Sequence, residues 1–431
     1  MTLWDTKKGV SEGFLNSPML PALPEEDESP SGNNKKEGFS SYLDHNAQAT
    51  GDLKSSLGTI TKSCKQDAEE RRLWNEKKQR KQNIARNLLG GRLELCGRVP
   101  VPVNYNNELI HTPHELRSIP VLKNDENFAF GGLMRCGSVW GCPDCASIIS
   151  EFRRKELQEA HAAALAKGLS VMMMTLTVPH YAKDHLKDVL NGISHTLRTF
   201  KNRKHYKIMS KMLGIKGDIR ALEVTYGKNG WHPHFHIMLF TEKSFTDESL
   251  SILKKSLLSQ WQAACTSSGL SSPNEHGLDL VNGEWAARYM TKWGIEEEMT
   301  KGHLKQGMKE GHVSPFGLLE ICAGGDSDDH DLKIKAGWKF KEYAREFKGK
   351  RQLVWSKGLR DLLGVGKQID DDKVIEEVEK KSEVFMTISY EDFKLILNHN
   401  KQAECLYVCR LGEEAVRAWL RNLRQKSISF P

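Results

Sequence analysis

Hydrophobic and polar positions follow two different periods along this chain, and they predict a mixture of strands and helices. Short apolar or alternating runs typical of strands occur at 169–178, in "IRALEVTY" (219–226) and in "WHPHFHIMLF" (231–240). Longer stretches with helical spacing lie at 68–89, 150–168, 184–213, 247–265 and 284–300. Strands that alternate with helices, together with one obvious hairpin, predict an α+β fold in which helices flank a central antiparallel sheet.

The last two of these strands form the hairpin, because Asn229-Gly230 between them is a strong turn signal. Alternate side chains of a strand leave on the same face, so His232, His234 and His236 share one face. The opposite face carries the apolar side chains that would turn towards the core, namely Trp231, Phe235, Ile237 and Leu239. Histidines grouped in this way hold a metal, share a proton or meet by accident on a wet surface.

The register of the hairpin decides whether Glu223 joins these histidines. A two-residue Asn-Gly loop puts Glu223 opposite His236, and a four-residue loop puts it opposite His234. A three-residue loop would turn the carboxylate to the other face. Either even-length loop predicts that Glu223, His234 and His236 bind a divalent cation that also binds substrate. Mixed imidazole and carboxylate ligands disfavour calcium and permit manganese, magnesium or zinc. His232 is then left to support the ligands or to contact the substrate.

A second group of candidate metal ligands lies in "RCGSVWGCPDCAS", which contains Cys136, Cys142 and Cys145. The Cys-Pro-x-Cys spacing is a zinc-knuckle geometry, and Cys96 in "ELCGR" upstream would supply a fourth thiolate. Four thiolates close a structural tetrahedral site, so the segment predicts a bound zinc. Buried or redox-active thiols are the alternative interpretation.

Composition changes along the chain and suggests four parts. Hydrophobic residues make up 39% of the 431 residues, a low value that we attribute to the N-terminal part. Residues 1–66 are rich in Pro, Ser, Asn and charged side chains. Such a composition cannot bury enough apolar surface to offset the entropy lost on ordering, so it predicts a disordered tail. A basic helix and a zinc-ribbon-like cysteine segment follow at 67–150, then the domain with the hairpin at 151–364 and a small C-terminal module at 365–431.

The formal net charge of +7 is modest, but basic residues are concentrated in runs at 71–86, 151–155 and 198–207. Such runs attract phosphate backbones, although a solvated helix face explains any single run equally well. The chain shows no signal peptide and no apolar stretch of membrane-spanning length, which predicts a cytoplasmic protein without a membrane partner. It contains no GxxxxGK[ST] phosphate loop, so any ATP-driven step has to come from a partner.

Four stretches in order resemble a known family: "MMTLTVPH" (173–180), "LEVTYGKNGWHPHFH" (222–236), "AARYMTKWG" (286–294) and "RQLVWSKGL" (351–359). They resemble the HUH endonucleases, named for a His-hydrophobic-His motif, and more closely the replication initiator (Rep) proteins of rolling-circle plasmids. The resemblance covers about Leu95 to Leu363 and implies an HUH nuclease domain at 151–364. It also implies metal-dependent nicking and rejoining of one DNA strand at a replication origin in a bacterial cytoplasm.

The family's chemistry implies a tyrosine that attacks a DNA phosphodiester and stays joined to the 5′ phosphate. Tyr289 in "YMTK" fits the family's Tyr-x-x-Lys pattern, and Lys292 lies one helical turn further on, where its charge can favour the phenolate. Tyr289 would otherwise only pack in an apolar stripe, and Tyr226 and Tyr181 are the next candidates. Some initiators carry a glutamate four residues before the tyrosine, whereas Glu284 stands five before it, on a different side of a helix.

These features together predict an initiator of rolling-circle replication for a plasmid or phage-like element. Its partners would be single-stranded or cruciform DNA at the origin, a host helicase and a host polymerase. Its cofactors would be manganese or magnesium at the nuclease site and a structural zinc. Two alternatives remain open: a transposase of the same nuclease superfamily, and a zinc-ribbon DNA-binding regulator without catalysis. The Glu223 pairing and the Tyr289–Lys292 pair argue against the regulator.

Overall fold

The computed structural model describes residues 64–101, 103–105, 108–110, 118–124, 127–283, 312–324 and 329–428, all within one compact unit. The predicted tail, up to residue 63, and the predicted site residues Tyr289, Lys292 and Glu284 lie outside these ranges. Within them, helices combine with antiparallel sheets, which confirms the α+β class. No helix in the described ranges has both the length and the apolar character that crossing a membrane requires.

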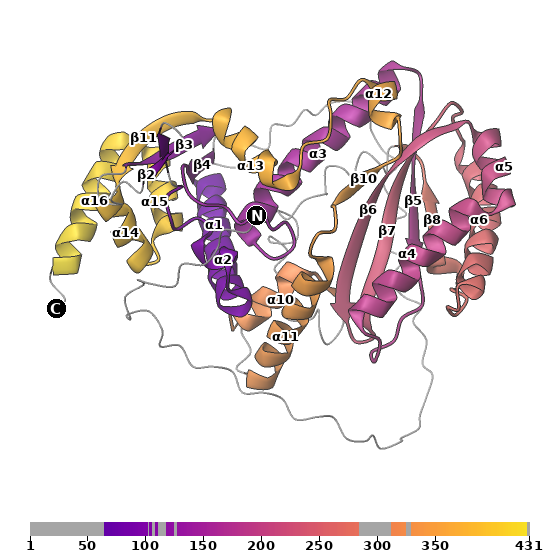
Figure 1. Ribbon diagram of the computed structural model, residues 1–431, viewed down its shortest axis with the longest axis horizontal. Helices are drawn as coiled ribbons and strands as arrows, with labels where there is room; N and C mark the ends of the chain where they lie inside the picture. The colour runs from indigo at the N-terminus through magenta and orange to yellow at the C-terminus, as the bar shows by residue number, and fades with distance from the viewer. Residues whose placement is uncertain are drawn as a thin grey trace. The chain divides into compact units, whose positions relative to one another are not determined.

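The central sheet is built around the predicted hairpin (Figure 1). Its described strands follow the order β10-β6-β7-β5-β8, β9 adds to β6, and every pair is antiparallel. The strands are β5 (Ser170–Thr177), β6 (Ile215–Gly227), β7 (Gly230–Thr241), β8 (Leu278–Val281), β9 (His312–Val313) and β10 (Leu353–Trp355).

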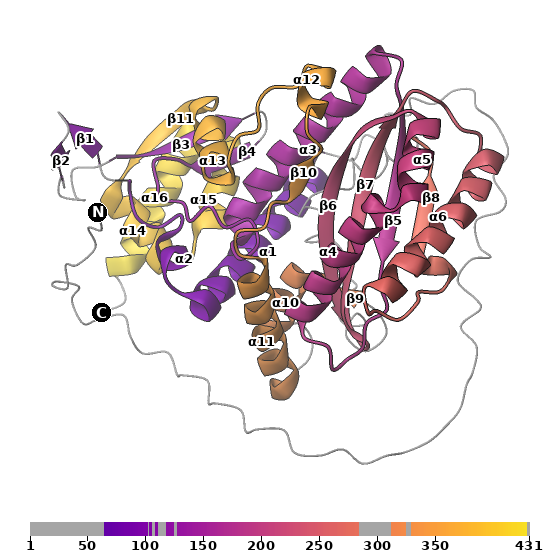
Figure 2. The ribbon, with the colours of Figure 1, turned by 45° about the vertical axis from the view of Figure 1, so that its right-hand side comes forward.

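Helices cover both faces of this sheet (Figure 2). Helices α4 (Leu186–Asn202), α5 (Lys204–Leu213) and α6 (Asp247–Ser267) pack on the apolar face, where Phe235, Ile237 and Leu239 are buried as predicted. On the opposite face, α3 (Pro143–Ala166) and α12 (Leu359–Leu363) bury Met238 and Phe240. This face of β7 therefore changes from imidazoles to core side chains along the strand.

The N-terminal basic helix is partly an internal element. Helix α1 (Cys64–Leu89) leads into α2 (Arg92–Leu95), and it packs against α10 (Pro315–Cys322) and α11 (His330–Phe347). Lys81 is fully buried and its ammonium lies 3.4 Å from a carboxylate oxygen of Glu320 on α10. Arg86, also buried, donates a 2.8 Å hydrogen bond to the carbonyl of Cys96. These two cations of the basic run hold the fold together and are not available to a phosphate backbone.

The C-terminal residues share a sheet with a segment near the cysteines. Strand β11 (Glu383–Ser389) pairs with β3 (Ser118–Asn124), which pairs with β4 (Asn127–Phe130). Boundaries at 150 and 365 therefore place β3 and β11, which pair, in different parts of the chain. Local periodicity gives no sign of this pairing, because the two strands are far apart in the sequence. The remaining elements are β1 (Val103–Tyr105), β2 (Glu108–Ile110), η2 (Glu275–Gly277), α13 (Asp371–Lys380), α14 (Tyr390–Asn398), α15 (Gln402–Val408), η3 (Cys409–Leu411) and α16 (Glu413–Ile428).

Candidate metal centres

The hairpin adopts one of the two predicted registers. Tyr226 pairs with Trp231 and Gly227 with Gly230, which places Glu223 directly opposite His234. The turn itself consists of Lys228 and Asn229, so the Asn-Gly loop that would have placed Glu223 opposite His236 does not form. Gly230 has φ 84°, and a Cβ atom there would lie 2.8 Å from the carbonyl oxygen of Tyr181. Only glycine fits this turn.

The register brings the predicted trio of ligands together. Oε2 of Glu223 lies 3.3 Å from Nε2 of His234 and 3.4 Å from Nε2 of His236. Donor atoms that one cation holds at about 2.1 Å lie about 3.0 to 3.4 Å apart, depending on the coordination angle. The observed separations fit that range, so these three residues form a possible metal site that keeps open positions for a substrate.

The surroundings of the trio keep the carboxylate of Glu223 ionised and orient the ring of His236. Burial alone would raise the pKa of Glu223, but His236 and His234 beside it hold that pKa well below its usual value. The carboxylate is therefore ionised. Thr175, the register partner of His236 on β5, places its Oγ1 3.1 Å from Nδ1 of that histidine. A bond at Nδ1 fixes the ring and leaves Nε2 turned towards the trio.

Three further histidines lie beside the trio, and the sequence alone indicates only one of them, His232. His232 lies outside the trio, and its Nε2 is 3.2 Å from the hydroxyl of Thr177. Its ring centroid lies 4.6 Å from that of His180 and 5.3 Å from that of His312. Burial, followed by the neighbouring imidazoles, lowers the pKa of His232 to about 3. His232 is thus neutral, and His180 and His312 are residues that the sequence reading missed.

A hydrogen bond fixes the start of β7 against the helical layer. The indole Nε1 of Trp231 donates a 2.9 Å hydrogen bond to Glu342 on α11, and the same carboxylate accepts from the backbone N–H of Leu186 at 3.1 Å. The rings of Trp231 and Tyr226 meet edge to face at 4.9 Å. Tyr226 is consequently 7% exposed, whereas Tyr181 is 54% exposed. Of these two alternative nucleophiles, only Tyr181 is open to a substrate.

The four predicted cysteines form a second possible metal site. The Sγ atom of Cys145 lies 3.5 Å from that of Cys96 and 3.6 Å from that of Cys136, and Cys96 lies 3.6 Å from Cys142. Around a zinc ion with bonds of about 2.3 Å, tetrahedral sulfur ligands lie about 3.8 Å apart. The cluster fits that geometry, and Cys142 also caps α3 by accepting from the N–H of Cys145.

Helix α1 completes the surroundings of this cysteine cluster. Oε1 of Gln82 accepts hydrogen bonds from the Cys142 thiol at 3.3 Å and from the N–H of Asp144 at 3.1 Å. Burial raises the pKa of Cys142 well above its usual value. Four thiolates side by side, three of them buried and that of Cys136 half-buried, therefore need a cation, and without one most of the group stays protonated.

The segment that contains the hairpin matches a known family. Residues 135–275 match the family described as replication protein. The matched segment contains Cys136, Cys142, Cys145 and the Glu223–His234–His236 trio, and the resemblance to replication initiators drawn from the sequence is confirmed.

Two curated relatives extend the comparison. The chain is 26% identical over 295 residues to "Protein rep" of Streptomyces lividans, which covers 54% of this chain and 64% of that protein. It is 29% identical over 133 residues to "Neomycin resistance protein" of Streptomyces cyanogenus, covering 25% of this chain and 30% of that protein. The chain thus spans less than two thirds of the length of these relatives. No solved structure matches it.

Proposed function

We propose that the chain initiates rolling-circle replication of a plasmid or phage-like element by nicking and rejoining one DNA strand at the origin. One observation carries the proposal: the Nε2 atoms of two imidazoles lie within 3.4 Å of one carboxylate oxygen on an antiparallel hairpin, inside the segment that matches the replication protein family. Two nitrogen ligands and one oxygen ligand on the same face suit a divalent ion that also binds a phosphate. We further propose that the domain at 151–364 is an HUH nuclease.

In this proposal Glu223, His234 and His236 hold manganese or magnesium. When bound, the ion polarises the scissile phosphate and helps to neutralise charge on its oxygens. Thr175 keeps the ring of His236 oriented, and neutral His232 contacts the substrate or supports the ligands. The four cysteines hold a structural zinc that fixes the start of α3, and the other end of α3 packs on the sheet beside the trio.

Tyr289, which lies outside the described residues, is the proposed nucleophile. Its phenolate oxygen attacks the phosphorus, a new P–O bond joins the tyrosine to the 5′ phosphate, and the bond to the 3′ oxygen breaks. The phenol proton leaves before the attack, with Lys292 stabilising the phenolate, and the 3′ oxygen takes up a proton to become a free hydroxyl. The phosphodiester energy is retained, so the reverse reaction can rejoin the strand.

The proposed substrate is single-stranded or cruciform DNA at the origin. A 3′ hydroxyl freed by the nick would prime a host polymerase. Strand opening ahead of that polymerase would come from a host helicase, because the chain contains no GxxxxGK[ST] motif. A zinc-ribbon regulator without catalysis would need the four cysteines but neither the trio nor Tyr289, and a transposase would use the same chemistry on other DNA.

A nicking assay tests the proposal directly. Single-stranded oligonucleotides that tile the DNA on both sides of the coding sequence are incubated with purified full-length protein, with manganese or with a chelator. The proposal expects cleavage of one oligonucleotide at one position, only with manganese, and none with His234→Ala or His236→Ala. Absence of cleavage across all oligonucleotides in wild type, with metal bound and the fold intact, would favour the regulator.

A further inference from the structure

Helices α4 and α5 carry an uninterrupted basic stretch that the candidate metal site does not use. Residues 189–217 contain seven Lys or Arg residues and no Asp or Glu, a number equal to the formal net charge of +7 of the whole chain. Two of these cations are neutralised from outside the stretch, Lys201 by Asp218 and Lys216 by Glu242. We call the exposed lysines of α5 the α5 ridge: Lys204, Lys207 and Lys211.

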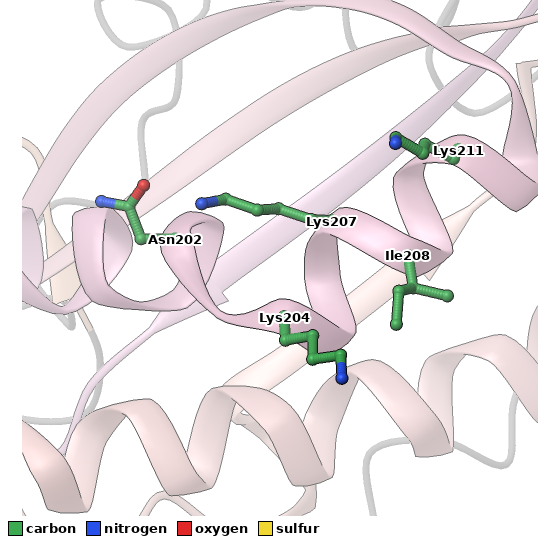
Figure 3. Close-up of a pocket in the computed structure, with 5 residues that line it drawn as sticks. All are labelled: Asn202, Lys204, Lys207, Ile208 and Lys211. Atoms are coloured by element: carbon green, nitrogen blue, oxygen red, sulfur yellow. The ribbon is translucent and has the colours of Figure 1, made fainter.

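The three lysines of the α5 ridge share one face of the helix. Spacings of three and seven residues keep their side chains within an arc of roughly 60°, and the rise of about 1.5 Å per residue spreads them over about 10 Å. Together with Asn202 and Ile208 they line a hollow of about 250 Å³, and the ammonium group of Lys207 points towards the amide of Asn202 (Figure 3). The hollow thus combines cations with an amide hydrogen-bond donor.

The ridge stands on a firmly packed base. Tyr206 and Leu213 on the inner side of α5 are buried, and the ring of Tyr206 contacts that of Phe200 on α4 at 4.8 Å. Both rings belong to the core on the apolar face of the sheet, opposite the face that carries the histidines. The helix that carries the lysines is therefore firmly packed, and it lies on a surface distinct from the candidate metal site.

Charge and spacing identify the partner. Along each strand of a DNA duplex the phosphates follow at about 3.4 Å of helix axis, so a row about 10 Å long faces roughly three of them. The exposed apolar neighbours are aliphatic, Ile208 and Met212, and the aromatic Tyr206 is buried. Because bases of a single strand bind by stacking on exposed aromatic rings, this surface suits a duplex backbone better than an unpaired strand.

We propose that the α5 ridge binds the phosphate backbone of duplex DNA next to the strand that is nicked. This inference rests on the proposed function, because it gives the ridge the double-stranded part of an origin as its ligand. It adds a second, sequence-independent contact surface on the side of the sheet away from the trio. Such a contact raises affinity and holds the duplex while a single strand occupies the metal site.

Duplex binding by full-length protein tests this inference. A fluorescent 30-base-pair duplex of arbitrary sequence is titrated at several salt concentrations against wild type and Lys204→Gln/Lys207→Gln/Lys211→Gln. The matched control removes three exposed lysines around the acidic helix α13, Lys367, Lys373 and Lys381, and changes the net charge equally. The ridge variant should bind about tenfold to a hundredfold more weakly near 0.1 M salt, with a log–log salt slope smaller by about 2 to 3.

The outcomes separate the ridge from the nuclease. The control should bind as wild type, and replacing the three ridge lysines by arginine should preserve affinity. The inference would be overturned if the ridge and control variants lost equal duplex affinity, if the ridge variant bound the duplex as wild type does, or if wild type did not bind the duplex. Unchanged duplex affinity in the ridge variant would point instead to an acidic protein partner. Cleavage of a short single-stranded oligonucleotide should survive in the ridge variant. If wild type does not cleave the oligonucleotide either, that result counts against the proposed function. The duplex titration alone then tests the ridge.

Discussion

Nε2 of His236 lies 3.4 Å from Oε2 of Glu223, although the two residues are not register partners. Glu223 pairs with His234, and His236 reaches the same oxygen from one pair further along β7. One carboxylate oxygen thus faces two imidazoles that leave the same side of the strand. The direct pairing with His234 and the diagonal contact with His236 together give a group of three candidate metal ligands.

Glu223→Gln keeps the shape of the side chain and removes its charge. Manganese affinity, measured by calorimetric titration, should fall by more than the roughly 10- to 100-fold that loss of an outer partner of a ligand causes. Folding should persist, because an amide can still accept hydrogen bonds from both imidazoles. Unchanged manganese affinity in a folded variant would mean that the ion binds elsewhere.

The three histidines of β7 should separate by function. His234→Ala and His236→Ala each remove a proposed ligand and should abolish metal-dependent cleavage, whereas His232→Ala should reduce it less. The reason is geometric: Nε2 of His232 faces the hydroxyl of Thr177 and not Glu223. Rates of oligonucleotide cleavage at saturating manganese measure the difference. Equal loss in all three variants would contradict the ligand assignment.

Thr175 and Thr177 provide a matched pair on the same strand. Thr175→Val removes the group that orients His236 and should weaken manganese binding by roughly 10- to 100-fold. Thr177→Val removes an equivalent contact to His232 and should leave manganese affinity close to that of wild type. Both variants preserve β-branched shape, so the comparison isolates the hydroxyl. Similar affinity losses in the two variants would show that general packing of β5 is responsible.

The cysteine cluster should contain zinc. Elemental analysis of the purified protein should find about one tightly held zinc per chain, and a chelator strong enough to remove it should lower the melting temperature. Cys142→Ser should lose zinc, whereas Cys265→Ala, at a buried cysteine outside the cluster, should retain it. Metal-free protein whose melting is unchanged would refute a structural zinc.

Local patterns predict the β6–β7 hairpin and its two faces, and they pick out the residues of both candidate ligand groups that the structure brings together. Alternation at period two was enough to place the three histidines on one side and Phe235 in the core. The choice between the two registers stays open in the sequence, because the Asn-Gly signal marks the place of the turn and is compatible with both loops. The structure adopts the register that pairs Tyr226 with Trp231.

Distant pairings explain the other omissions. His312 comes beside His232 only because β9, a strand of two residues, pairs with the end of β6. Such a short strand has no periodicity to recognise. Likewise, β11 joins β3 across more than 250 residues of sequence, so reading the chain in consecutive parts could not reveal a shared sheet. Lys81 belongs to a basic run in the sequence. No local pattern shows that it is buried beside Glu320, which lies on a helix far along the chain.

We expect the nicking reaction to leave a covalent bond between Tyr289 and a 5′ phosphate. The cleaved oligonucleotide, incubated with manganese and protein, should give an adduct that migrates slowly on a denaturing gel and is absent with Tyr289→Phe. Mass spectrometry of the digested adduct should place the nucleotide on the peptide that contains Tyr289. A nucleotide on Tyr181 or Tyr226, or cleavage that leaves a free 5′ phosphate and no adduct, would contradict the account.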